Sequence, residues 1–230
     1  TADGGTIKLD GNYPVGTENV ALGDTALDSV QSGGNYNVAI GDKSLTDNTT
    51  GDQNTAVGRV SLTNNTTGGN NVAIGGDALF TNTTGGNNVA VGKDSLSLNT
   101  TASENTAVGY QAGYSTTTGG ANTAVGVKAL YLNTTAVANT ALGWNAAYSN
   151  TTGAFNVAIG YQSLASNTTA SQNTAVGYQA GYSNTTGISL AHFGYQAGRS
   201  NTTGDDNSFF GRSSGYSTTT GNYNTGIGRS

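Results

Sequence analysis

The chain has 230 residues and a formal net charge of −5, with 36 glycines, one proline and no cysteine. Hydrophobic residues make up 34% and charged residues 9%, well below the roughly 45–50% and 25% of an ordinary globular domain. These values exclude disulfide scaffolds and Cys-based zinc sites. They also argue against a conventional single-core domain, a charge-rich disordered chain and a protein that binds nucleic acid through its phosphates. The sequence contains no apolar run of the length, about 20 residues, that would predict membrane insertion.

The first segment, residues 1–18, lies outside the repeat that fills the rest of the chain, and it contains the only proline, Pro14. We interpret this segment as an N-terminal cap or a lead-in from a preceding domain. Residues 19–230 form a single repeat domain. Because Ser230 follows the last repeat glycine by two residues, without a cap, we expect the repeats to continue beyond this sequence as part of a longer fibre.

From residue 19 onward the sequence repeats, and the constant spacing predicts the architecture. A glycine recurs at steps of 17 residues: Gly41, Gly58, Gly75, Gly92, Gly109, Gly126, Gly143, Gly160, Gly177, Gly194, Gly211 and Gly228. A thirteenth copy ends at Gly23, one step of 18 earlier. A slip anywhere would move every later repeat out of register, so each repeat is one turn, or rung, of a coil. The sequence therefore predicts an all-β fold, a parallel β-solenoid of thirteen 17-residue repeats.

The positions of each repeat are numbered here as columns one to seventeen, and residues 156–160 (Asn-Val-Ala-Ile-Gly) occupy columns one to five. Columns two and four carry β-branched or other apolar residues on either side of a small column three, the period-two pattern of a strand. We expect columns two and four to face the core. Ala191 and Ser208 in column two each precede a phenylalanine in column four (Phe193, Phe210), which we interpret as a volume exchange inside that core.

Column three is alanine in most copies, and we expect this strip to lie opposite the core. Each rung has few large apolar side chains, so a single coil would bury little surface. Homotrimerisation around the alanine strip would supply more burial, and a monomeric coil is the alternative.

Two motifs carry a resemblance to known families. The pentapeptide Asn-Val-Ala-Ile-Gly at residues 37–41, 71–75 and 156–160 resembles the signature of YadA-like heads of trimeric autotransporter adhesins. Asn-Thr-Ala-Val-Gly-Tyr-Gln-Ala, as at residues 173–180, resembles the repeats of phage tail-fibre proteins, especially those of cyanobacterial phages. The resemblance covers essentially residues 19–230, although the adhesin heads have a shorter repeat.

The resemblance implies a left-handed β-roll, three chains side by side, and an extracellular location on a virion fibre or a bacterial surface. It implies a structural and adhesive role in attachment to a host cell, with a cell-surface glycan or protein receptor as the partner, and it offers no catalytic residue and no cofactor. A phage tail-fibre region is the first interpretation, and the head of a bacterial trimeric surface adhesin is the alternative.

Column six changes character along the chain. No charged side chain occurs from Ala129 to Gly198, and columns six and seven there hold Trp-Asn and then Tyr-Gln pairs. The 17-residue period predicts that these rings lie one above another. They could bind a glycan or receptor, or they could form a ladder that stabilises neighbouring rungs. The candidate surface comprises Tyr110, Trp144, Tyr161, Tyr178 and Tyr195.

Few side chains could act in catalysis, because the chain has one histidine, no cysteine and scattered carboxylates. We therefore expect no enzyme activity and no metal site. His192 occupies column three. We interpret it as a packing substitution. The alternative is that three copies meet at a trimer axis, where they would bind an ion or sense pH.

The Asn-Thr-Thr triplets in columns twelve to fourteen are formally N-glycosylation acceptors, but we interpret them as stacked turn ladders. Ranks of threonine also suggest ice binding. Adjacent threonines such as Thr185 and Thr186 should point to opposite sides of a strand, which makes this the weaker interpretation. The triplets begin at Asn48, Asn65, Asn82, Asn99, Asn133, Asn150, Asn167, Asn184 and Asn201.

Overall fold

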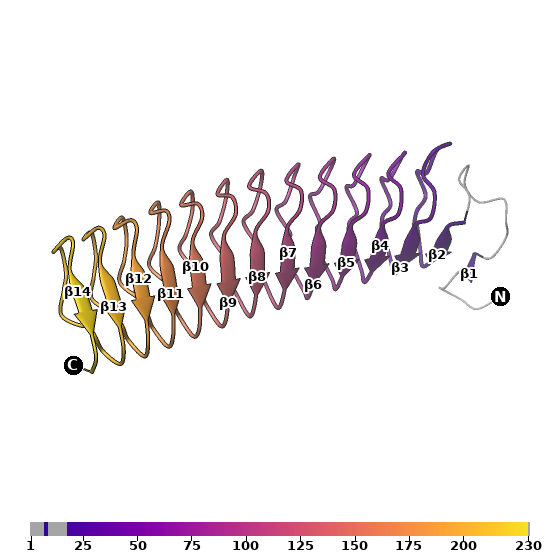
Figure 1. The fold of residues 1–230 in the computed structure, drawn as a ribbon. Coiled ribbons are helices and arrows are strands. Elements are labelled where there is room, and N and C mark those ends of the chain that lie inside the picture. Colours follow the sequence, from indigo (N-terminus) through magenta and orange to yellow (C-terminus); the bar gives the residue numbers. More distant parts are fainter. Residues whose placement is uncertain (1–6, 9–17, 230) are drawn as a thin grey trace. The chain divides into compact units, whose positions relative to one another are not determined.

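The computed structural model describes residues 7–8 and 18–229, arranged in two compact units, residues 1–118 and 119–230. Each unit is a parallel β-solenoid, as the sequence predicted, and the described residues contain no helix (Figure 1). The cap or lead-in predicted for residues 1–18 falls outside the described residues except for Ile7–Lys8 and Glu18.

In the first unit, β1 pairs antiparallel with β2, and the strands from β2 to β7 form a parallel ladder. Each strand pairs with the next in the same columns, as Val38 pairs with Thr55 and Ile40 with Val57. The strands of this unit are β1 (Ile7–Lys8), β2 (Val20–Leu22), β3 (Val38–Ile40), β4 (Thr55–Val57), β5 (Val72–Ile74), β6 (Val89–Val91) and β7 (Thr106–Val108).

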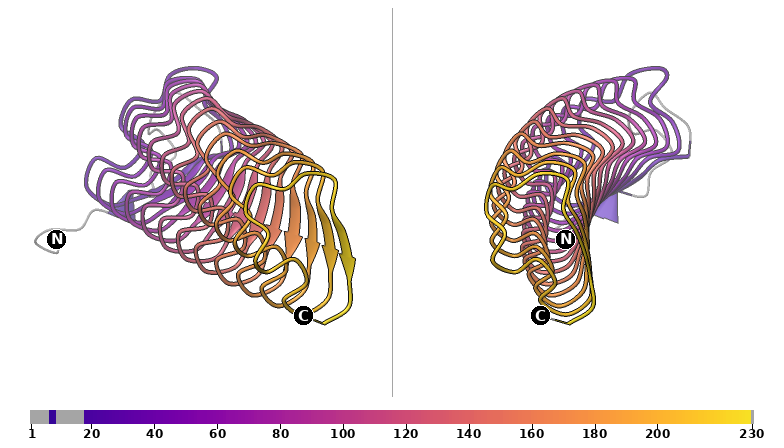
Figure 2. Two further views of the ribbon diagram at one scale, coloured as in Figure 1. Left: turned by 90° about the vertical axis from the view of Figure 1, so that its left-hand side faces the viewer. Right: turned by 60° about the vertical axis from the view of Figure 1, so that its left-hand side comes forward.

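The second unit has the same parallel ladder from β8 to β14. Figure 2 shows that the chain leaves the end of each strand, loops back and returns to the start of the next. The strands of this unit are β8 (Thr123–Val125), β9 (Thr140–Leu142), β10 (Val157–Ile159), β11 (Thr174–Val176), β12 (Ala191–Phe193), β13 (Ser208–Phe210) and β14 (Thr225–Ile227).

The predicted orientation of the strands was wrong, because column three faces the interior and columns two and four face outward. In β10, Ala158 is fully buried, whereas Val157 and Ile159 are half-exposed. Leu142, also in column four, is 47% exposed. Inside the coil, column three meets the buried leucines of column nine and the buried asparagines of columns one and twelve. This narrow interior accommodates a methyl group at column three, so the alanine strip is the core and not a surface seam.

Two ladders of buried asparagines run through the interior. In column twelve, the Asn65 Nδ2 donates to the Gly68 carbonyl and to the Asn48 Oδ1 in the neighbouring rung, both at 2.9 Å. In column one, the Asn54 backbone N–H donates to the Asn37 Oδ1 at 2.9 Å. Buried polar groups destabilise a fold unless they are hydrogen-bonded, so the ladders satisfy most of these amides and fix the register between rungs. The exceptions in column twelve are the Oδ1 atoms of Asn99 and Asn201, where threonine follows in the next rung and the oxygen has no partner.

A volume exchange does occur in the interior, between columns three and nine. His192 and Phe209 replace alanine in column three, and in the same rungs Gly198 and Gly215 replace the usual leucine of column nine. A Cβ added at Gly198 would lie 2.3 Å from the His192 ring, and one at Gly215 would lie 2.4 Å from the Phe209 ring. The exchange predicted between columns two and four was therefore placed on the wrong face, since Phe193 is outside and 37% exposed.

Column five requires glycine for two reasons. Gly160 has a φ of 125°, a conformation that other residues rarely adopt. A Cβ there would also lie 2.5 Å from the Gly177 carbonyl oxygen of the next rung. The glycine that marks the 17-residue period is therefore a point of close approach between successive rungs, at the turn that follows each strand.

Candidate binding surface

The aromatic residues of column six form the predicted ladder in the second unit. Ring centroids are 4.9 Å apart for Trp144–Tyr161, 5.2 Å for Tyr161–Tyr178 and 5.1 Å for Tyr178–Tyr195. The ring planes are within 10° of parallel, and the four residues are 41–45% exposed. The fifth predicted residue, Tyr110, belongs to the first unit and is 44% exposed.

The ladder leaves little ring face for a sugar. Each inner ring is covered on both faces by its neighbours, and the Arg212 guanidinium lies 5.5 Å from the Tyr195 ring centroid. The glutamines of column seven also bond along the coil, because the Gln179 Nε2 donates to the Gln162 Oε1 at 2.9 Å. Ring edges remain exposed. The geometry therefore favours a ladder that stabilises neighbouring rungs over stacking of sugars on the ring faces.

A second group of aromatic and cationic side chains, which was not among the candidate site residues predicted from the sequence, lies in column ten. The Arg199 guanidinium is 5.3 Å from the Tyr182 ring centroid and 5.7 Å from that of Tyr216. Its Nε donates to the Gln179 Oε1 at 3.1 Å. The signal was present, because the two tyrosines lie 17 residues before and after the arginine, the spacing at which side chains stack.

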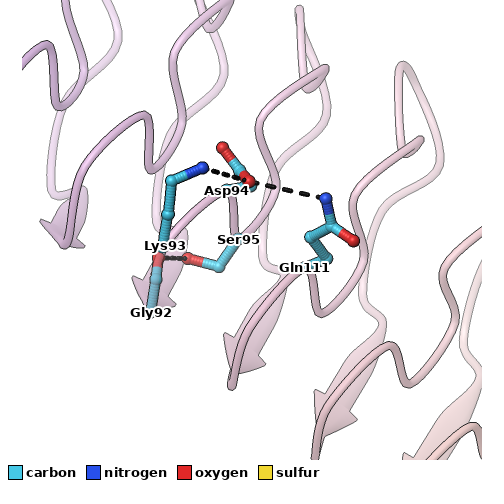
Figure 3. Close-up of polar contacts among 5 residues, drawn as sticks. All are labelled: Gly92, Lys93, Asp94, Ser95 and Gln111. Carbon is cyan, nitrogen blue, oxygen red and sulfur yellow. Dashed lines mark hydrogen bonds and ion pairs between the residues drawn. The ribbon is translucent and has the colours of Figure 1, made fainter.

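The first unit has charged residues where the second has rings. Figure 3 shows the Lys93 Nζ against the Asp94 Oδ2, at 2.7 Å, with the Gln111 Nε2 of the next rung 3.4 Å from the same oxygen. The hydrogen bond to Asp94 raises the pKa of Lys93 above its usual value. Arg59 and Asp42 form a similar exposed ion pair at 3.6 Å. Exposed pairs of this kind contribute little to stability.

His192 lies inside its own coil, which contradicts the interpretation that three copies meet at an axis. The side chain is fully buried, it stacks on Phe209 with centroids 5.3 Å apart, and neither ring nitrogen has a hydrogen-bond partner. Burial lowers the pKa of His192 to about 4. Over the described residues, no group of three or more His, Cys, Asp or Glu side chains could hold a metal ion.

The asparagines of the Asn-Thr-Thr triplets are the column-twelve ladder and are fully buried. Their amide nitrogens are hydrogen-bonded in the interior, which favours the turn-ladder interpretation over glycosylation. The threonines of column thirteen are also engaged, since the Thr168 Oγ1 donates to the Thr185 carbonyl oxygen at 3.1 Å. This bond makes those hydroxyls part of the ladder instead of a free rank for ice.

Apolar side chains are also exposed on the outward face of the strands, columns two and four, named here the strand face. Its exposed members include Ile74 and Val108 in the first unit, and Leu142, Phe193 and Phe210 in the second. Contiguous apolar surface of this kind usually marks an interaction site. In the part of the chain that the structure describes, no helix is long and apolar enough to cross a membrane.

Comparison with known proteins gives no relative, because no family model, no curated protein and no solved structure matches the chain.

Proposed function

We propose that the chain is a structural and adhesive segment of an extracellular attachment fibre, of the phage tail-fibre type, in which three copies associate through their strand faces. The observation that carries this proposal is the outward orientation of the apolar column four, beside the valines and threonines of column two, on successive rungs of each unit. A face that repeats at every rung can be covered by another copy in the same register, and the buried area then grows with the number of rungs.

The seam of this assembly differs from the one expected from the sequence. The alanine strip is buried inside each coil, so it cannot contact another copy. Columns two and four offer valine, isoleucine, leucine, phenylalanine and threonine instead, a composition suited to a dry interface between sheets. The number of copies, three, and the left-handed coil are taken from the resemblance to adhesin heads and tail-fibre repeats.

In this role the chain acts mechanically and without a catalytic step or a cofactor. The asparagine ladders in both units, and the glutamine and aromatic ladders in the second, join neighbouring rungs, which makes a coil that resists bending. A trimer presents every surface residue three times, so weak sites for a host-cell glycan or protein receptor would combine into avidity. The available contacts for such a ligand are the ring edges of column six.

The test is the solution mass, measured by light scattering coupled to size exclusion. We expect three times the chain mass for the natural sequence and one chain mass for Ile159→Lys/Val176→Lys, which places two charges on the strand face. Ser183→Lys, in column eleven away from that face, is the matched control and should stay trimeric. A natural sequence of one chain mass would overturn the proposal.

Attachment is tested separately with the labelled protein on a glycan array and on bacterial cells. The trimer should bind at least about 100-fold more tightly than the Ile159→Lys/Val176→Lys variant, because avidity is lost on dissociation. A trimer that binds neither sugars nor cells would leave a structural fibre segment without an adhesive role.

A further inference from the structure

Two flanks border the strand face, one at each end of every strand. The leading flank is columns sixteen and seventeen, which precede the strand, and the trailing flank is column six, which follows the glycine at its end. Figure 1 shows that these positions lie at opposite ends of the strands in each unit. The five intervening residues separate the flanks of one copy by roughly 15 Å.

In two rungs, the two flanks carry opposite charges. Asp52 on the leading flank shares its rung with Arg59 on the trailing flank, in the first unit. Asp205 and Asp206 share their rung with Arg212, in the second. Asp52, Arg59, Asp206 and Arg212 are exposed, and Asp205 is half-exposed.

In three rungs of the second unit, both flanks carry apolar or aromatic residues. Val137 shares its rung with Trp144, and Ile188 shares its rung with Tyr195. Phe155, which is 60% exposed, shares its rung with Tyr161. In the first unit, where column six is largely charged or small, the leading flank is polar except for Tyr36, which is 52% exposed. Neither kind of match occurs in the rungs of β2 (Glu18 and Asp24), β3 (Tyr36 and Asp42), β6 (Asn87 and Lys93), β7 (Glu104 and Tyr110) and β11 (Gln172 and Tyr178).

Contacts within one copy do not explain why the two flanks of a rung carry opposite charges. Arg59 pairs with Asp42 and Arg212 lies over Tyr195, both in column six of a neighbouring rung. The Asp205 Oδ1 accepts a hydrogen bond from the Ile188 backbone N–H at 2.9 Å. That bond does not require a carboxylate, since Ser171 makes it at the same column in another rung. The negative charge is therefore left without an explanation inside the coil.

We propose that the leading flank of one copy contacts the trailing flank of the next copy at the same level, so that the copies close head to tail around the strand face. This inference rests on the self-association in the proposed function and specifies its arrangement. In a closed ring of identical chains, the contact is heterologous and uses two different surfaces of each copy. The trailing flank of one copy then lies beside the leading flank of the next copy at each rung. This places Arg212 of one copy beside Asp205 and Asp206 of the next, and Tyr161 of one copy beside Phe155 of the next.

Cross-linking tests this arrangement directly, because the natural chain has no cysteine. The variant Asp206→Cys/Arg212→Cys places thiols on the two flanks of one rung. On addition of an oxidant, we expect a covalent three-chain product on a denaturing gel. The matched control is Gln172→Cys/Arg212→Cys, whose flank positions lie two rungs apart, about 10 Å along the coil. A disulfide needs Cα atoms within about 7 Å, so the control should remain uncross-linked.

The outcomes separate this inference from the proposed function. If the natural protein is a trimer by light scattering and neither double variant cross-links, the head-to-tail contact is wrong and the trimer stands. If both variants cross-link equally, the contact exists without level register, and the same-rung pairing is wrong. A natural protein of one chain mass overturns the proposed function together with this inference.

Discussion

The two units share an interior and differ in surface. Columns one, three and twelve have the same buried alanines and asparagines in both. Of the thirteen acidic residues, however, eleven lie in residues 1–118 and two in residues 119–230, while the eight basic residues divide equally. Column six changes from charged residues to a ladder of rings. The comparison shows that the inward columns determine the coil, whereas the outward columns can vary without changing it.

The largest expected effect is in the shared interior. Ala158→Phe should destabilise the protein by about 3 kcal/mol, because the ring would overpack the space occupied by Leu164. Adding Leu164→Gly should recover part of the loss, since this pair reproduces Phe209 with Gly215. Ala73→Phe and Leu79→Gly should behave alike in the first unit. Urea unfolding measures these changes.

The control for this prediction is on the surface. Ile159→Phe enlarges the neighbouring residue on the strand face, and its effect on the unfolding of isolated chains should be within about 0.5 kcal/mol. A larger loss from Ile159→Phe than from Ala158→Phe would contradict the assignment of column three to the interior.

The second effect is pH dependence confined to the second unit, because the first unit contains no histidine. Burial lowers the pKa of His192 from 6.5 to about 4, so the folded state binds fewer protons than the unfolded state. The stability is fully present above pH 6.5 and is lost as the pH falls toward 4, by up to about 3 kcal/mol.

The measurement is the melting temperature at pH 7 and pH 4.5 for the natural protein and for His192→Phe, which keeps a ring beside Gly198. Carboxylates titrate in both proteins, so the difference between their pH profiles isolates the histidine. Parallel profiles would show that protonation of His192 is not coupled to folding.

The third effect concerns the column that distinguishes the units. Tyr178→Ala removes two stacked contacts of the ladder and should cost about 1–3 kcal/mol. Lys93→Ala removes an exposed ion pair in the first unit and should cost less than about 1 kcal/mol. Chemical denaturation compares the two variants. If Tyr178→Ala abolished glycan or cell binding with unchanged stability, the main role of the ladder would be ligand binding and not stabilisation of neighbouring rungs.

The smallest effect is electrostatic. Arg212→Asp places like charges on the two flanks of one rung and should weaken the trimer by about 1 kcal/mol at low salt. The reversed pair Arg212→Asp/Asp206→Arg should restore it. Dilution series followed by sedimentation velocity at low and high salt measure this difference, which should shrink as salt screens the charges. If the natural protein, Arg212→Asp and the reversed pair dissociated equally, the opposite charges on the flanks would not contribute to the stability of the trimer.

The period of the sequence was sufficient to predict the coil, because side chains 17 residues apart must stack if no residue is inserted. The same spacing predicted the rings from Trp144 to Tyr195. It could not tell which face of the strand is inside. Alternation shows that columns two and four share a face, but the volume of the interior decides which face that is.

The information needed for that decision was present in two rungs. The two large residues in column three, His192 and Phe209, each coincide with a glycine six residues later. Such a coincidence is expected if columns three and nine occupy the same space, although column nine is also glycine beside alanine in two other rungs, at Gly113 and Gly181. The 17-residue spacing also predicts the position of Arg199 between two tyrosines. The absence of hydrogen-bond partners for the His192 ring nitrogens, in contrast, depends on burial, which a sequence pattern alone does not give.

The parallel ladders also have a consequence for how the chain reaches this structure. Within the parallel part of each unit, a strand pairs only with the strand one repeat before it and the strand one repeat after it. Relative contact order therefore stays low, which favours fast folding for a β protein. Once a first pair of rungs has formed, each further rung can add to an existing template, so synthesis and folding could advance along the chain at the same pace.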